Sequence, residues 1–272
     1  MLIATYLLGI QINKILVGGI MDKEALKAYR YFLKDSIRKK IVFRNTDQNR
    51  HIPPPPIQNP CPADAKRIDL PGSDEWKEVV KTDLTQAIAN RKSHRKYLKK
   101  NLSKLELAYL LWATQGLRES AVQGHAYRTV PSAGCRHSFE TYLAIFNVDG
   151  IEPGIYRYLP VDHQLVFEFL DDMLEEKMIH ASLGQTYPGR SAVTFIWVAI
   201  PYRMEWRYGL AAHKVIALDA GHVCQNLYLA CEAIDAGTCA IAAYDQEELD
   251  EFLGLDGENE FAIYLAPVGK IK

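Results

Sequence analysis

The chain has 272 residues, enough for one large domain or for one domain behind an N-terminal extension. Hydrophobic residues make up 48% and charged residues 24%, as in globular proteins, and the net charge of -1 offers no field that would attract nucleic acid or a membrane surface. The five cysteines are an odd number without Cys-x-x-Cys spacing, which argues against a disulfide framework and a zinc site. We therefore expect a reduced, cytoplasmic protein without a metal centre.

The first 20 residues form an apolar segment that fits no ordinary class. They lack the basic start and the cleavage site of a signal peptide, and Gln11, Asn13 and Lys14 interrupt the run, so that stable membrane association is not expected. Met21 opens an amphipathic helix over 21–40 and resembles a natural start. Three explanations of residues 1–20 are open: a mis-assigned start, which we favour, an appended segment, or a targeting segment. The sequence thus divides into 1–20, 21–80 and 81–272.

A proline-rich arm follows the first helix. Seven of the 13 prolines lie between Pro53 and Pro71. Such a stretch favours polyproline II, offers few hydrogen-bond donors and is not expected to build regular structure. We interpret it as an extended arm that wraps the surface, with a ligand for proline-recognising modules as the alternative.

Regular secondary structure is predicted beyond residue 74. A capping box of Ser103 and Glu106 begins an apolar helix that ends near Gly116, and a nearly continuous apolar run over 193–200 indicates a buried central strand. The mixture of elements predicts an α+β fold. Further helices are expected over 83–90, 171–183, 213–236 and 246–253, and further strands over 139–146, 156–158, 164–169, 238–242 and 261–268.

A basic cluster, defined as Arg91, Lys92, Ser93 and Arg95, follows the predicted helix 83–90. Forked cationic donors and a hydroxyl at alternating positions suit a phosphate monoester. The alternative is a solvated run of charges.

Three further segments carry weaker signals. The first is the loop 131–134, whose small residues would let a flat ligand approach the backbone; the alternative is a simple tight turn. The segment 238–245 offers backbone amides at a strand end, and the last strand ends in a glycine and a cation that could bind phosphate or form a frayed tail. The residues concerned are Pro131, Ser132, Ala133 and Gly134 in the 131–134 loop, Ala242 and Ala243 in the second segment, and Gly269 and Lys270 at the end.

The order and spacing of these motifs over 83–270 resemble the nitroreductase superfamily. The shared motifs are Arg-x-Ser-x-Arg, Leu-Leu-Trp-Ala-x-Gln-Gly, Pro-Ser-Ala-Gly, Asp-Ala-Gly-His with Gln-Asn in the long helix, Gly-Thr-Cys-Ala-Ile and the terminal Pro-Val-Gly-Lys. The run Glu-Pro-Gly-Ile-Tyr-Arg-Tyr at 152–158, followed by His163, is similar to the azoline-oxidase-like branch in particular.

The resemblance implies an FMN-dependent oxidoreductase with a sandwich fold, a mostly antiparallel sheet flanked by helices, and a homodimer. It assigns the FMN phosphate, ribityl chain and pyrimidine edge to the basic cluster, with Gly269 and Lys270 at the phosphate. It places the backbone of Ala242 and Ala243 near flavin N5. It also implies that the 131–134 loop of the partner subunit approaches the flavin. NAD(P)H would be the co-substrate. The family uses it without a Rossmann fingerprint, and this chain has neither that fingerprint nor a P-loop.

One departure from the branch concerns catalysis. Azoline oxidases carry a Lys-Tyr pair before the long helix, whereas this chain has Arg207 and Tyr208. Arginine keeps its proton and is a poor general base. We therefore expect NAD(P)H-driven reduction of a nitroaromatic, quinone or related small-molecule acceptor by hydride transfer through flavin N5. The alternatives are a dehydrogenase that oxidises a peptide azoline or small molecule, and a non-catalytic flavin carrier or sensor.

Overall fold

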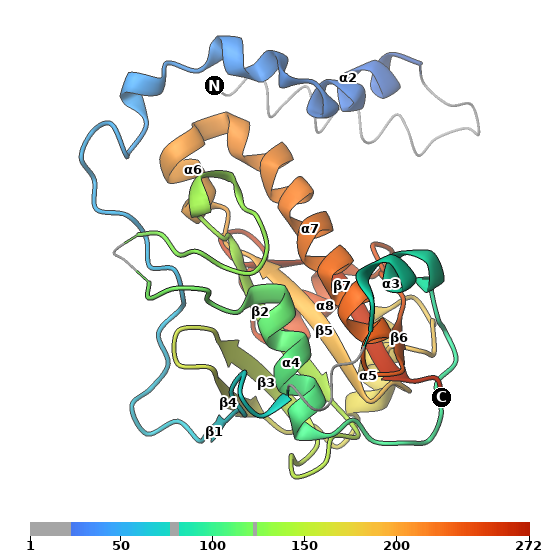
Figure 1. The fold of residues 1–272 in the computed structure, drawn as a ribbon. Coiled ribbons are helices and arrows are strands. Elements are labelled where there is room, and N and C mark those ends of the chain that lie inside the picture. The colour runs from blue at the N-terminus through green and yellow to red at the C-terminus, as the bar shows by residue number, and fades with distance from the viewer. Residues whose placement is uncertain (1–22, 77–81, 122–123) are drawn as a thin grey trace.

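The structure is a computed structural model that describes residues 23–76, 82–121 and 124–272. The segment 1–20 lies outside the described residues. The described chain forms one sheet with helices packed on both faces (Figure 1). This arrangement confirms the predicted α+β fold. Within the described ranges, none of the helices is long and apolar enough to cross a bilayer.

Seven strands form the sheet, and each strand runs antiparallel to its neighbours in the order β1-β4-β3-β2-β5-β7-β6. The central strand β5 lies between β2 and β7, and all of its residues are buried, as the apolar run predicts. The strands are β1 Arg67–Asp69, β2 Phe139–Ile145, β3 Gly154–Leu159, β4 Gln164–Phe169, β5 Val193–Ala199, β6 Ala236–Thr238 and β7 Phe261–Lys270.

Local capping interactions fix several helix ends. The Ser103 hydroxyl accepts from the Glu106 amide while the Glu106 carboxylate accepts from the Ser103 amide, so the predicted capping box is present. Asp83 caps the next helix upstream, because its carboxylate accepts from the amides of Thr85 and Gln86. The helices are α2 Lys23–Leu33, α3 Leu84–Asn90, α4 Lys104–Gln115, α5 Leu174–Ala181, α6 Tyr202–Tyr208, α7 Ala212–Glu232 and α8 Gln246–Leu253.

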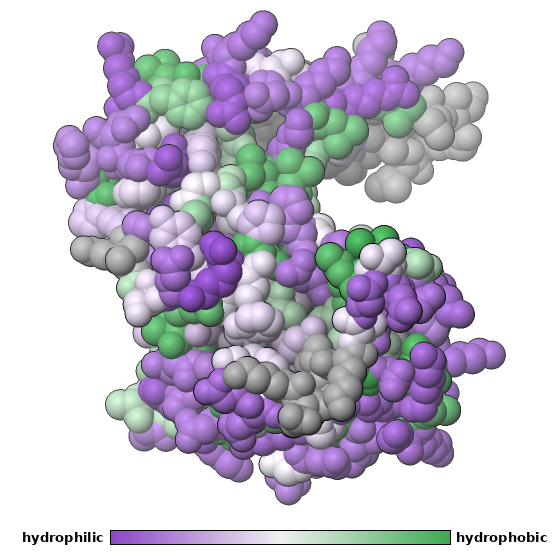
Figure 2. Space-filling view, viewed as in Figure 1, coloured by the Kyte–Doolittle hydropathy of each residue, from purple (hydrophilic) through white to green (hydrophobic). Residues whose placement is uncertain are grey.

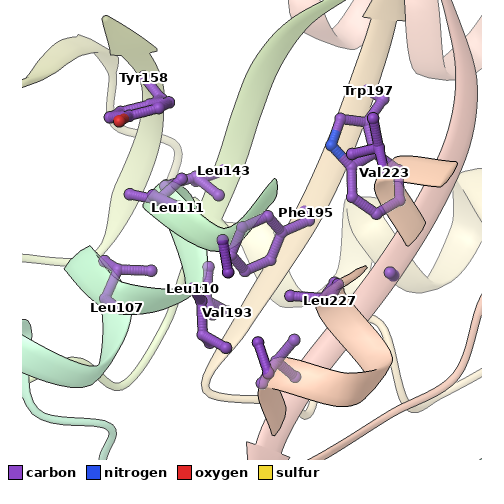
Figure 3. Packing of buried hydrophobic residues seen from close by; sticks show 14 of the residues in the cluster. Leu107, Leu110, Leu111, Leu143, Tyr158, Val193, Phe195, Trp197, Val223 and Leu227 are labelled. Atoms are coloured by element: carbon purple, nitrogen blue, oxygen red, sulfur yellow. The ribbon is translucent and has the colours of Figure 1, made fainter. Parts of the chain in front are cut away.

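The alternation of side chains along β5 divides the core into two layers. Phe195 and Trp197 pack against α4 and α7, where they meet Leu110 and Leu227 (Figure 3). The intervening side chains, such as Ile196, point to the other face and pack against α5 and α8. Because both faces are covered, β5 needs apolar residues at every position, which explains its continuous hydrophobic run.

The structure differs from the sequence predictions in four places. The strand predicted over 238–242 lies at β6 instead, because Ala236–Thr238 pairs with the end of β7 and only an isolated bridge between Ile241 and Leu265 continues the pairing beyond it. The proline-rich arm does build regular structure, since β1 pairs with β4 and forms the edge of the sheet. The short helix α6 lies in a segment for which no helix was predicted, and the long helix ends at Glu232 rather than Ala236.

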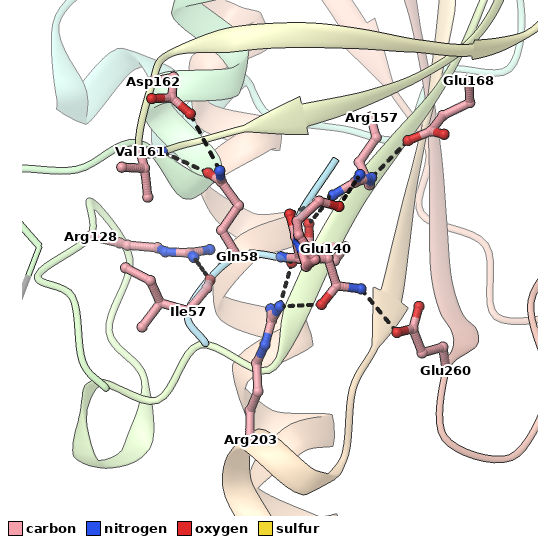
Figure 4. Close-up of polar contacts among 12 residues, drawn as sticks. Ile57, Gln58, Arg128, Glu140, Arg157, Val161, Asp162, Glu168, Arg203 and Glu260 are labelled. Atoms are coloured by element: carbon pink, nitrogen blue, oxygen red, sulfur yellow. Dashed lines mark hydrogen bonds and ion pairs between the residues drawn. The ribbon is translucent and has the colours of Figure 1, made fainter. Parts of the chain in front are cut away.

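The arm is held to the sheet by a buried polar network around Glu140 (Figure 4). The Glu140 carboxylate is paired with Arg203 of α6 and with Arg157 of β3. It also accepts a hydrogen bond from the backbone amide of Asn59 at 2.8 Å. Arg157 also donates to the backbone carbonyls of Asn59 and Pro60, each at 3.0 Å. The arm therefore supplies the acceptors that buried guanidinium groups require.

Glu140→Gln should lower the free energy of unfolding by about 3–5 kcal/mol, because it leaves buried guanidinium charge without its main counterion. Chemical denaturation with linear extrapolation measures the change. The matched control is Glu175→Gln, which removes an exposed partner of Arg190 and should cost about 1 kcal/mol or less. Equal effects of the two substitutions would show that the network does not hold the fold.

Candidate functional site

The basic cluster leaves α3 and runs beside β6. Ser93 forms a parallel bridge with Thr238, and the His94 amide donates to the Thr238 carbonyl at 2.9 Å. A Cβ atom at Gly237 would lie 2.7 Å from the His94 ring, so this approach requires glycine. The cluster is thereby fixed next to the segment 239–243.

Tyr228 of α7 joins these two segments. Its hydroxyl lies 2.9 Å from the Ser93 hydroxyl and accepts from the Ala240 amide at 2.9 Å. The Arg91 guanidinium lies over the Tyr228 ring, 5.2 Å from its centroid. No sequence pattern indicates this role, because a tyrosine in a largely apolar helix is typical of packing.

Exposed donors surround this junction. Arg95 lies over the Tyr187 ring at 5.9 Å, and the hydrogen bond with Tyr187 raises the pKa of Arg95. Ala242 and Ala243 are exposed, and among the described residues their amides have no hydrogen-bond acceptor. No carboxylate in the described chain forms an ion pair with a member of the basic cluster. We call this arrangement the cationic cradle; its residues are Arg91, Lys92, Ser93, Arg95, Tyr228, Ala242 and Ala243.

Gly269 and Lys270 have structural partners of their own. Gly269 packs on the Tyr97 ring, where an added Cβ would lie 2.6 Å away. Lys270 is buried, its ammonium is paired with the Glu106 carboxylate, and it donates to the Ile234 carbonyl at 2.6 Å. A contact between Lys270 and a phosphate would therefore require this buried ion pair to open.

The 131–134 loop lies against α6 and the middle of α7. The Ala133 amide donates to the Asp219 carboxylate at 3.3 Å, and burial raises the pKa of Asp219. A Cβ atom at Gly134, where φ is +60°, would lie 2.8 Å from the Tyr208 hydroxyl and 2.9 Å from Arg207 Nε. The loop thus forms one unit with the two candidate catalytic residues.

Two interactions fix this unit from behind. The His137 amide donates to the Ser132 hydroxyl at 3.0 Å, and the His137 ring contacts the Ala126 carbonyl at 2.9 Å. Burial lowers the pKa of His137 to about 3, with Arg128 adding to the effect, so the ring is neutral. The loop therefore has a defined position without a ligand.

Helix α7 separates the loop from the cationic cradle. Tyr228 lies nine residues after Asp219, which corresponds to about 13 Å along the axis and about two and a half turns. The two residues consequently lie on opposite faces of the helix. The structure brings the basic cluster together with Ala242 and Ala243, and the 131–134 loop together with Arg207 and Tyr208, but it does not join these groups within one chain.

Comparison with known proteins identifies the family. The model of the nitroreductase family matches residues 88–270, which is more than half of the chain. The chain belongs to the nitroreductase family. Among its relatives, a protein of Methanocaldococcus jannaschii that is provisionally named a nitroreductase is 30% identical over 207 residues, covering 76% of this chain and 98% of the relative.

Solved structures agree with this assignment. A provisionally named nitroreductase from Ralstonia eutropha superposes with a TM-score of 0.63 at 26% identity, covering 81% of this chain and 97% of that one. A chain of the Escherichia coli microcin synthetase complex, bound to a truncated precursor, superposes with a TM-score of 0.56 at 15% identity and covers 93% of this chain and 99% of that one. At that identity the likeness concerns the fold alone. Because 93% of this chain is covered, the similarity in fold extends beyond residues 88–270 into the N-terminal part.

Proposed function

We propose that this nitroreductase-family protein is an FMN-dependent enzyme that uses NAD(P)H to reduce a nitroaromatic, quinone or related acceptor. The observation that carries the proposal is the cationic cradle, in which Arg91, Ser93 and Arg95 lie beside two exposed, unpaired amides at Ala242 and Ala243. All five cysteines are free, which suits the reducing cytoplasm that we propose as its location.

The donor set of the cradle fits FMN. Guanidinium groups and the Ser93 hydroxyl match a terminal phosphate monoester, which carries more charge and more free oxygens than a bridging diphosphate. The amides of Ala242 and Ala243 can donate to the polar edge of a planar ring. When bound, FMN supplies hydride acceptance and donation at N5; the chain supplies charge, orientation and hydrogen-bond donors.

We further propose a homodimer formed through α7. Its free face carries Ala217, Leu218 and Gly221 beside three polar residues, His213, His222 and Gln225, and Leu218 is 54% exposed. Apolar side chains also gather over the neighbouring helix α3, where Leu84 and Ile88 are exposed (Figure 2). A second copy would cover this surface and bring its own 131–134 loop toward the cradle, which one chain alone cannot do because α7 lies between them.

Arg207 and Tyr208 have different roles in this proposal. Arg207 supplies a positive charge, whereas the Tyr208 hydroxyl beside Gly134 can orient an acceptor or donate a proton to it. A reductase needs such a donor, while azoline oxidation needs a base. The likeness in fold to the microcin synthetase chain keeps a dehydrogenase as the second candidate function.

Anaerobic reduction tests the activity. The purified yellow protein should lose its flavin absorbance when NADH or NADPH is added, and a quinone or nitroaromatic should restore it over repeated cycles. Oxidation of thiazoline peptides without NAD(P)H would instead identify the dehydrogenase. A flavin that neither nicotinamide bleaches and no thiazoline peptide reduces would identify a carrier.

Arg91→Ala should weaken FMN binding by about 1.5–3 kcal/mol, the contribution of a charge-assisted hydrogen bond. Titration of flavin-free protein with FMN, followed by quenching of flavin fluorescence, measures the affinity. Lys96→Ala is the control, because Lys96 is exposed and lies outside the cradle. Unchanged affinity in Arg91→Ala, or release of FAD in place of FMN on denaturation, would contradict the assignment of the cradle.

Leu218→Glu should convert the dimer to monomers and lower its flavin content, because it places a charge in the proposed apolar interface. Light scattering and absorbance report both properties. Leu170→Glu, at a position that is 60% exposed and directly follows β4, should leave both unchanged. A wild-type monomer that retains FMN tightly would rule out the shared site.

A further inference from the structure

A small cavity borders the 131–134 loop at Gly134. Its volume is about 320 Å³, and it lies between the proline-rich arm, the segment before the loop and α6. The lining residues that matter for its chemistry are Pro54, His125, Tyr127, Arg136, Trp206 and Arg207. Gly134 and Cys135 also border it, so the cavity adjoins the loop that carries the candidate catalytic unit.

Arg136 is a buried cation without a counterion. Its side chain is almost fully buried, its Nε donates to the Arg203 carbonyl at 2.9 Å, and its guanidinium lies over the Trp206 ring at 4.7 Å. Its Nη2 atom has no hydrogen-bond partner, and no carboxylate of the described residues forms an ion pair with it. Native proteins rarely leave such a group unpaired, and an unpaired one calls for an explanation.

Arg207 adds a second uncompensated charge at the same wall. Its guanidinium lies over the Tyr208 ring at 5.5 Å, and it has no ion-pair partner in the described chain. Burial lowers the pKa of Arg136, and the nearby charges of Arg207 and Arg203 lower it further. The neighbouring carboxylate of Glu205 is engaged with His213. The cavity therefore combines two guanidinium groups with no anion of its own.

We propose that this cavity binds the carboxylate of a planar aromatic acid, and that the acceptor reduced by the enzyme carries this group. The guanidinium fork matches a carboxylate in plane and spacing. The Trp206, Tyr127 and His125 rings suit a flat apolar body, and a volume of about 320 Å³ is at the lower end for ligand pockets. The proposal rests on the proposed function and adds the substrate class to it.

The cavity positions the acceptor beside the catalytic unit. A carboxylate at Arg136 and Arg207 would direct the rest of an aromatic acid toward Gly134 and Tyr208, which adjoin this wall. For a nitro acid, the first reduction consumes one NAD(P)H and one proton and yields the nitroso acid, NAD(P)⁺ and water. The hydride supplies the two electrons, and one N–O bond breaks as its oxygen leaves in water.

Paired acceptors test the proposal in the FMN-loaded protein. We expect kcat/KM for para-nitrobenzoate to exceed that for the neutral para-nitrotoluene by about tenfold or more, mainly through KM. Arg207→Gln should remove most of this preference, and Arg207→Lys should retain part of it. Arg190→Gln is the control, because it removes an exposed arginine far from the cavity and should leave the preference unchanged.

Calorimetric titration with benzoate separates the inference from the proposed function. Wild-type protein should bind benzoate, and Arg207→Gln and a folded Arg136→Gln should bind it about tenfold more weakly or not at all. Equal turnover of the two acceptors, or benzoate binding that Arg207→Gln does not weaken, would overturn the carboxylate site while the reductase stands. Absence of turnover with both acceptors and with quinones would overturn the proposed function, and the benzoate titration would then decide the cavity alone.

Discussion

The Glu140 carboxylate lies where four segments of the chain meet. It receives hydrogen bonds or ion pairs from Arg203 of α6, Arg157 of β3 and the Asn59 amide of the arm, while Glu140 itself belongs to β2. Because a buried charge is stable only when its partners are in place, these segments must assemble together. The network also positions the candidate site, because α6 carries Arg207 and Tyr208 one turn after Arg203. The arm, held by the same network, forms one wall of the neighbouring cavity.

Helix α7 is the second constraint on function. It is long enough to contact the 131–134 loop through Asp219 on one face and the basic cluster through Tyr228 on the other. Its position makes a single chain an incomplete flavin site under the proposed function. The exposed Leu218 on its free surface supplies a physical reason for a second copy to bind there. Catalysis and assembly would then depend on the same helix.

The pairing of cations distinguishes structural positions from candidate ligand positions. Lys270 is buried against Glu106, and Arg157 is paired with Glu140 and Glu168, so these cations are satisfied by the protein. Arg91 and Arg136, in contrast, have no carboxylate partner among the described residues, although one is half-exposed and the other is buried. Under the two proposals, this difference corresponds to two separate anion sites, one for the phosphate of a cofactor and one for an acidic acceptor.

Features that depend on neighbours a few residues apart can be predicted from the sequence: the Ser103 capping box, the apolar run of β5, the α+β class and the motifs of the basic cluster. The folded chain was needed to show that Lys270 pairs with Glu106, that Tyr228 joins Ser93 to Ala240, and that β1 forms an edge strand. These contacts join residues far apart in the chain. Many side chains could serve as the hydrogen-bond or ion-pair partner of each group. Which one does so depends on how the whole chain packs.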